Sequence, residues 1–164
     1  MFKFTICFIK QGDRVLVLNR QSPEWMGAWN GVGGKIDRNE TPLNGVLREV
    51  HEETGIVLEA SQIQHKGYAT WHGIDGSSLG GMYIFLAELP ETVDYKTPIK
   101  TDEGILDWKD LSWLLHPKNR GVADLKYYLS TIIEKDDLFD YRFTYDDNET
   151  MIRFEKVSLG QMVE

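Results

Sequence analysis

The chain has 164 residues, of which 41% are hydrophobic and 27% are charged. This mixture is typical of a folded domain with its own core and excludes a largely disordered chain. The formal net charge of -8 at pH 7 argues against binding to a nucleic acid polymer or to an anionic membrane. We therefore expect a single domain over residues 1–164 that acts on a small molecule. A phosphate-bearing substrate would need cations near the site.

The single cysteine and the N-terminal segment bear on where the protein works. Cys7 lies in an apolar run and has no partner for an internal disulfide, which fits a reducing compartment. The segment MFKFTICFIK is short and lacks a small-residue cleavage site, so it predicts a strand rather than a signal peptide. No apolar run in the sequence approaches the length of a membrane span. We expect a soluble, cytoplasmic protein, either monomeric or homodimeric.

The first predicted elements form a hairpin and a loop. Two runs rich in β-branched residues, FKFTICFI and RVLVLNR, flank a turn at residues 10–13. The segment QSPEWMGAWNG contains proline and glycine without periodicity, which predicts a loop. VGGKI then predicts a short strand that leads into a turn at residues 37–39.

A helix is predicted from Pro42 to Thr54. Thr41 is the expected N-cap, Pro42 suits the first helical position, and Gly55 is the expected stop. Its apolar stripe comprises Leu43, Val46, Leu47 and Val50. Helical spacing places three carboxylates together on a face other than this stripe: Glu49, Glu52 and Glu53.

The second half of the chain alternates strands and helices. IQHKGYATWHG and GMYIFLAEL predict strands around a glycine-rich loop at residues 73–81, and EGILDW predicts another strand. DLSWLL predicts a helix, and GVADLKYYLSTIIEK predicts a long amphipathic one. A closing hairpin is predicted over residues 138–157, with its turn at 146–148. This order favours one α/β (α+β) domain built around a mixed sheet.

The three clustered carboxylates pose a chemical question, because like charges on one helical face repel each other. A solvated acidic face is one interpretation. The other is a site for a hard divalent cation, since Mg²⁺ prefers oxygen ligands and bridges carboxylates to substrate phosphates. Gly33 and Gly34 favour the second interpretation, because glycine lets the backbone approach a metal and frees a carbonyl to bind it.

These residues resemble the Nudix box, a pattern of glycines, glutamates and one arginine at fixed spacing. The matching positions are Gly34, Glu40, Arg48, Glu49, Val50, Glu52, Glu53, Gly55 and Ile56. The Nudix resemblance implies an α/β/α sandwich around a mixed sheet. It also implies a hydrolase for nucleoside diphosphates linked to another moiety, with Mg²⁺ or Mn²⁺ as cofactor.

The same resemblance implies roles for individual box residues. Glu49, Glu52 and Glu53 would be metal ligands, and Gly33 would contribute a carbonyl to the metal. Arg48 would orient the carboxylates, and Glu40 would secure the loop against Arg48. The metal would polarise phosphoryl oxygens and lower the pKa of the attacking water.

Glu103 is a further candidate, outside the box. The segment Thr101–Gly104 precedes the strand ILDW and resembles the place where related enzymes carry a catalytic glutamate. Glu103 is therefore expected to be a general base or an extra metal ligand. An exposed turn glutamate is the alternative, and the general base itself stays open between Glu49, Glu53 and Glu103.

The segment AWNGVGGK resembles the corresponding part of MutT-like hydrolases of oxidised purine nucleoside triphosphates. That resemblance implies that Asn30 reads the purine, because an amide can both donate and accept on one base edge. Thr5 matches a second position of the same pocket. Arg20 and Lys35 would contact the phosphates. For each of these residues an ordinary turn or surface role is the alternative.

One region departs from the human-type enzymes, which carry a tryptophan and an aspartate pair there to sandwich and read the base. Here the stretch is HPKNRGVAD, without tryptophan and with Asp124 as its acidic residue. The residues that could stack on a base instead are Trp25, Trp29, Trp71 and Trp113. Selectivity for 8-oxoguanine is therefore an open question.

We expect a pyrophosphohydrolase that converts purine nucleoside triphosphates such as 8-oxo-dGTP to monophosphate and pyrophosphate, in nucleotide-pool sanitation. One alternative is a Nudix hydrolase of ADP-ribose or other nucleoside diphosphate derivatives. That group usually carries a proline about sixteen residues after the box, where this chain has TWHGID. The dinucleoside polyphosphate group carries a tyrosine nearby, which is missing at that spacing. A second alternative is a nucleotide sensor, which would be expected to lose box carboxylates.

Overall fold

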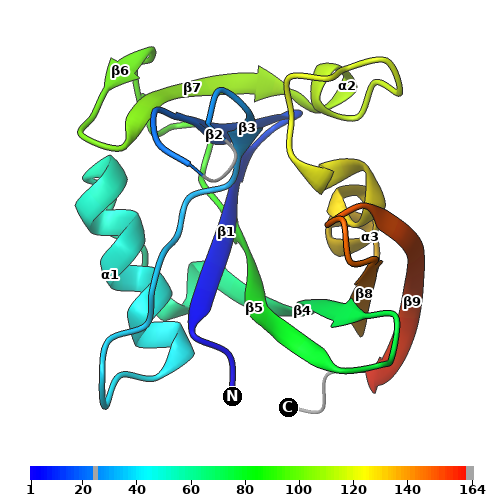
Figure 1. The fold of residues 1–164 in the computed structure, drawn as a ribbon. Coiled ribbons are helices and arrows are strands. Elements are labelled where there is room, and N and C mark those ends of the chain that lie inside the picture. The colour runs from blue at the N-terminus through cyan, green and yellow to red at the C-terminus, as the bar shows by residue number, and fades with distance from the viewer. Residues whose placement is uncertain (24–25, 162–164) are drawn as a thin grey trace.

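A mixed β-sheet organises the computed structural model, which describes residues 1–23 and 26–161. Within these residues the sheet has nine strands, in the order β6-β7-β2-β1-β5-β4-β8-β9, with β3 paired to β2 (Figure 1). The pairs β1–β5 and β4–β8 are parallel, and the others are antiparallel. The strands are β1 (Phe4–Gln11), β2 (Arg14–Arg20), β3 (Trp29–Asn30), β4 (Ile63–Gly73), β5 (Ser78–Glu88), β6 (Ile99–Lys100), β7 (Gly104–Asp110), β8 (Asp137–Tyr145) and β9 (Met151–Gln161).

Helices cover both faces of this sheet, which therefore separates two hydrophobic clusters. On one face Val46 and Val50 of α1 (Pro42–Thr54) share a cluster with Cys7 and Ile9 of β1. On the other face lie α2 (Leu111–Leu114), η2 (Asp124–Tyr127) and α3 (Leu129–Glu134), which pack on alternate residues of β1. A further short turn of helix, η1 (Ala60–Gln62), leads into β4. Because β1 is covered on both sides, its sequence is a continuous apolar run rather than an alternating one.

The predicted hairpins and the box helix are confirmed, and four other predicted segments differ from the structure. The predicted loop around residues 73–81 is shorter, since β5 already begins at Ser78. The predicted loop QSPEWMGAWNG ends in the two-residue strand β3. The predicted strand VGGKI is instead an irregular segment that touches β1 through isolated bridges at Val32 and Lys35.

The predicted long helix over residues 121–135 is wrong, because the chain forms η2 and α3 with a break at Tyr128. The two neighbouring tyrosines explain the break. Tyr127 packs edge-on against Phe143, whereas Tyr128 packs against Phe8 and Tyr141. Between these contacts the backbone leaves helical geometry at Tyr128, with φ -140° and ψ -18°. None of the helices in the described ranges is long and apolar enough to cross a membrane.

Candidate active site

Local signals at both ends fix the position of α1. The Thr41 hydroxyl accepts a hydrogen bond from the Asn44 N–H at 3.1 Å, and Pro42 occupies the first turn. Gly55 ends the helix in the left-handed conformation, at φ 77°. Val46 and Val50 are buried, whereas Leu43 is 36% exposed and lies at the border of the predicted stripe. This orientation turns Glu49 and Glu53 toward the segment 31–35 and leaves Glu52 exposed.

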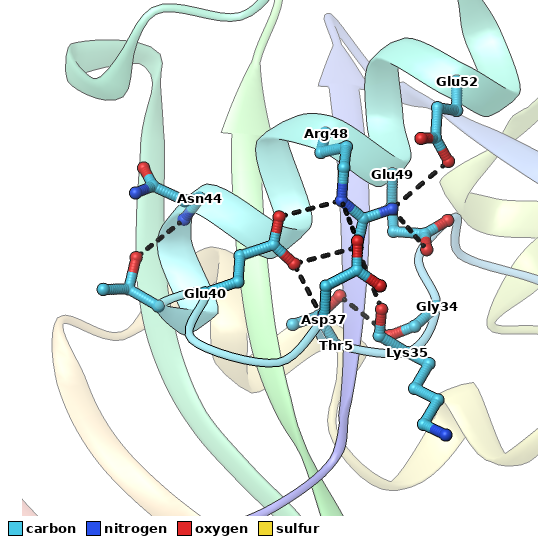
Figure 2. A network of polar contacts seen from close by, with 10 residues as sticks. Thr5, Gly34, Lys35, Asp37, Glu40, Asn44, Arg48, Glu49 and Glu52 are labelled. Atoms are coloured by element: carbon cyan, nitrogen blue, oxygen red, sulfur yellow. Dashed lines mark hydrogen bonds and ion pairs between the residues drawn. The ribbon is translucent and has the colours of Figure 1, made fainter.

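The Arg48 guanidinium is the centre of a polar network that ties the loop to the helix (Figure 2). It donates two hydrogen bonds to Glu40, at 2.8 and 2.9 Å, and one to the carbonyl of Lys35 at 3.0 Å. It also reaches Glu49 at 3.1 Å and Glu52 at 3.2 Å. The hydrogen bonds from Arg48 lower the pKa of Glu40 to about 2. Arg48 therefore fixes two carboxylates of the helix relative to the preceding loop.

Glu53 lies on the inner side of the same helix. Its carboxylate accepts a hydrogen bond from the Gly33 N–H at 2.9 Å. Burial raises the pKa of Glu53 to about 8, and the negative charges of Glu49 and Glu103 act in the same direction. Burial also raises the pKa of Glu49. These carboxylates are therefore costly to ionise together unless a cation is present.

The two glycines allow the backbone to pass between β1 and the helix. At Gly33, φ is +152°, and a Cβ there would collide with the carbonyl oxygen of Thr5. A Cβ on Gly34 would lie 2.6 Å from the Glu49 carboxyl carbon. Thr5 donates its backbone N–H to the Gly34 carbonyl at 2.9 Å, which holds the segment against β1. The predicted role for Gly33 concerned its carbonyl, whereas the hydrogen bond to Glu53 uses its N–H.

A cavity of about 820 Å³ lies beside these carboxylates. It gathers most of the residues predicted for catalysis and binding, although they come from distant parts of the chain: Thr5, Arg20, Asn30, Gly33, Gly34, Lys35, Glu49, Glu53 and Glu103. Arg48, Glu40, Glu52 and Gly55 do not line it. The predicted residues therefore fall into two groups. One group lines the cavity, and the other lies outside it and holds the lining residues in place.

The family is decided by comparison of the chain with known proteins. Residues 3–129 match the NUDIX domain family model. The chain belongs to the Nudix family. It is 25% identical over 151 residues to the oxidized purine nucleoside triphosphate hydrolase of Mus musculus, with 92% of this chain and 91% of the mouse protein covered. The Danio rerio protein of the same name is 26% identical over 149 residues, with 90% and 89% covered.

The fold comparison agrees with the family assignment. A crystal structure of a MutT protein from Bacillus halodurans superposes with a TM-score of 0.71 and 24% identity. The superposition covers 95% of this chain and 97% of the bacterial one. The predicted MutT-like Nudix resemblance and the α+β Nudix fold are confirmed.

The Nudix carboxylates can be tested for their fit to a cation. The hard oxygen donors of Glu49, Glu53 and Glu103 suit Mg²⁺ or Mn²⁺. The positive charge of such a cation would offset the effect of burial, which raises the pKa of Glu53. Among the described residues, no three His, Cys, Asp or Glu side chains already converge closely enough to hold a metal. Fewer than three of these carboxylates therefore lie close enough to bind one ion together, so water and substrate oxygens would supply the rest of its coordination shell.

Glu103 lies across the Nudix cavity from the helix, in the turn before β7. The Thr101 hydroxyl accepts from the Glu103 N–H at 3.1 Å, and Gln21 donates its N–H to the Glu103 carbonyl at 3.1 Å. These bonds tie the turn to the end of β2, next to Arg20. Glu103 thus faces the box carboxylates from a different element, although 50 residues separate it from Glu53 in the sequence.

Apolar residues that sequence reasoning did not assign also line the cavity: Phe4, Ile6, Leu18 and Met82. Of the four tryptophans considered for stacking, Trp71 lines the cavity, and Trp25 lies outside the described residues. Trp29 and Trp113 instead pack beneath the ammonium of Lys109, at 4.7 and 5.3 Å. The signal that could have singled out Trp71 is the alternation of side chains along β4, which places Trp71 on the same face as the buried Ala69.

Asn30 and Asp124, the two residues connected with base reading, occupy different positions. Asn30 lines the cavity, and its side-chain oxygen accepts the Gly31 N–H at 2.8 Å. Its two amide N–H groups and the second lone pair of its oxygen remain available for a ligand. Asp124 does not line this cavity, and burial raises the pKa of its carboxyl.

Proposed function

We propose that this Nudix hydrolase cleaves purine nucleoside triphosphates, including oxidised ones such as 8-oxo-dGTP, to the nucleoside monophosphate and pyrophosphate. The observation that carries the proposal is the composition of one cavity. Carboxylates, two cations, two aromatic rings and one amide all line it together. The names of the mouse and zebrafish relatives support the same substrate class.

In this cavity Glu49, Glu53 and Glu103 would hold a divalent metal, with Glu52 beside them on the outer surface. A bound Mg²⁺ would polarise a phosphoryl oxygen and acidify a water molecule. Arg20 and Lys35 line the same cavity and would bind the phosphates despite the net charge of -8.

The hydrolysis needs no covalent intermediate. The oxygen of water forms a bond to phosphorus, the bond from that phosphorus to the bridging oxygen breaks, and pyrophosphate leaves. A water proton passes to one carboxylate among Glu49, Glu53 and Glu103. Arg48 does not touch the cavity, so its contribution is to hold Glu49 and Glu52 in place.

In the same cavity Trp71 would stack on the base and Asn30 would read its edge. Asn30 would donate an amide N–H to a base acceptor such as the 6-oxo group of guanine, and its oxygen, which already accepts the Gly31 N–H, keeps a second lone pair for a base donor.

The test compares kcat/KM with Mg²⁺ for 8-oxo-dGTP, dGTP, dATP and ADP-ribose. Loss of one buried hydrogen bond is worth roughly 1–3 kcal/mol, so Asn30→Ala should lower kcat/KM for the guanine nucleotides about tenfold or more. The control is Asn44→Ala, which removes an exposed amide on α1. Preferential turnover of ADP-ribose, or equal activity of Asn30→Ala and Asn44→Ala, would overturn this assignment.

A further inference from the structure

A second cavity, of about 640 Å³, lies at the opposite end of the central strands. Along β1, Phe4 lines the Nudix cavity and Lys10 lines the second one. Six residues of strand separate them, which corresponds to about 20 Å. Met82 and Glu88 divide β5 in the same way. The second cavity is therefore distinct from the site of proposed hydrolysis.

Lys66 is the unusual residue of this cavity, because it is only 3% exposed and lies on an interior strand between β5 and β8. Lysine is almost never so deeply buried unless it is paired. Within the described residues, no carboxylate forms an ion pair with Lys66. Its ammonium donates one hydrogen bond, to the carbonyl of Lys135 at 2.7 Å.

Capping of the α3 C-terminus accounts for that one bond, since Lys135 is the residue that ends the helix. An ammonium carries three N–H donors. Two donors of a buried charge therefore still need acceptors, and the cavity lies beside them.

The backbone of β4 is built to place Lys66 in this position. The pairing of β4 with β5 shifts register between His65 and Gly67, which makes Lys66 the extra residue of a β-bulge. Gly67 has φ +113°, and a Cβ there would collide with the carbonyl oxygen of Phe139. The bulge lets His65 pack among aromatic rings while the next residue, Lys66, reaches the end of α3.

The other groups around the cavity are arranged by depth. Lys10 supplies a second ammonium, which pairs loosely with Glu88 at 3.7 Å. The carboxylates Glu88, Glu91 and Asp136 are exposed at the rim, where water screens them. The remaining lining residues are polar at Ser61, Gln62 and Gln64 and apolar at Leu86, Leu89, Pro90 and Ile133. The buried charge of the cavity is thus positive.

We propose that this second cavity binds a compact anion, a carboxylate or phosphate group, on the ammonium of Lys66, with Lys10 as the second cation. The anion accepts the two remaining N–H donors of Lys66. The amides and hydroxyl on the wall supply further hydrogen bonds.

The experiment is a titration of the full-length chain followed through its backbone amide NMR signals. Divalent cations are removed with EDTA, and sodium phosphate and sodium acetate are added separately at constant pH and ionic strength. We expect saturable shifts at residues 64–67 and 135–136 with at least one anion. Phosphate alone, acetate alone or both then identifies the anion class.

Three variants make the assignment specific. Lys66→Gln should weaken the binding about tenfold or more, Lys66→Arg should retain it, and Lys35→Gln, in the Nudix cavity, should leave it unchanged. If Lys66→Gln does not fold, Lys10→Gln replaces it and should weaken binding. No saturable shift with either anion, or shifts that respond to Lys35→Gln and not to the cavity variants, would overturn the proposal. Either result would leave the proposed hydrolysis untouched.

Discussion

Arg48 connects groups from different parts of the Nudix box, Asp37 at 3.3 Å among them, and its shape explains why. The planar guanidinium bonds Glu40 through two nitrogens while it still reaches Glu49, Glu52 and the Lys35 carbonyl. A lysine ammonium is a single point charge and cannot span these directions. The charge of residue 48 therefore matters less than the geometry of its donors.

Arg48→Lys tests this interpretation. We expect kcat to fall roughly 10- to 100-fold, the loss typical when the groups supporting metal ligands are removed. Steady-state kinetics with Mg²⁺ measures the effect. The control is Arg153→Lys, which alters an exposed Arg153–Glu155 pair on β9. Similar kcat values for the two variants would show that the network around Arg48 does not position the carboxylates.

Glu40 gives the network a pH dependence. Its pKa is lowered from 4.5 in the unfolded chain to about 2 in the fold, so ionised Glu40 stabilises the protein above pH 4.5. That stability is lost as the pH falls from 4.5 toward 2. Glu40→Gln should therefore unfold more easily than the wild type at pH 7, with the difference shrinking toward pH 2. Urea unfolding at a series of pH values measures this, and a difference that grows on acidification would contradict it.

At the scale of elements, α1 owes its bounds to local chemistry. Thr41→Ala removes the N-cap hydrogen bond to Asn44, which should lower the free energy of unfolding by about 0.5–2 kcal/mol. The kcat well below the melting temperature should not change, because Thr41 does not line the cavity. Thr92→Ala, at an exposed loop position, is the control. A loss of kcat without loss of stability would show that Thr41 acts on the site directly.

The same local chemistry explains which elements could be predicted. The cap, Pro42 and Gly55 are signals within a few residues of the helix they bound, and the structure confirms its range. The break at Tyr128 depends instead on rings of β1 and β8 that are far away in the sequence. The irregular path at Gly33 depends on a close approach to Thr5. Such tertiary contacts are not encoded in the periodicity of a segment.

At the scale of the whole molecule, one part of the site could be predicted from the sequence and another part could not. Glu49 and Glu53 could be named because the Nudix box has fixed spacing, and Glu103, Asn30, Arg20 and Lys35 could be named from resemblance. The structure brings these six residues to one cavity, whereas Glu52 of the box does not line it. The aromatic side of the cavity is formed by β1, β5 and β4, which lie side by side in that order in the sheet. This arrangement could not be predicted from the individual strands. Trp71 therefore stood among several equivalent tryptophans until the sheet was known.

Burial of Glu53 in the cavity also lowers the stability of the whole metal-free protein. Because the pKa of Glu53 is raised to about 8, the folded protein keeps a proton that the unfolded chain releases above pH 4.5. Metal-free stability should therefore fall as the pH rises from 4.5 to 8. Glu53→Gln lacks this penalty, so its melting temperature in EDTA should exceed that of the wild type at pH 9 and approach it near pH 4.5.

We expect a difference of at least 2–4 °C at pH 9, roughly what 1 kcal/mol produces in a domain of this size. Mg²⁺ should raise the melting temperature of the wild type more than that of the variant, because binding stabilises the folded state. Differential scanning calorimetry in EDTA and in Mg²⁺ measures both effects. A variant less stable than the wild type at pH 9 in EDTA would contradict the expected cost.

The central claim is that the enzyme uses its box carboxylates to hydrolyse a phosphoanhydride bond. Product analysis tests this claim most directly. With Mg²⁺ and 8-oxo-dGTP or dGTP, the wild type should release the monophosphate and pyrophosphate. Glu53→Gln should lower kcat by roughly 10²–10⁴-fold, and Glu155→Gln, on the exposed strand β9, should not. Wild-type kcat in Glu53→Gln, or release of the diphosphate and inorganic phosphate instead, would contradict the account.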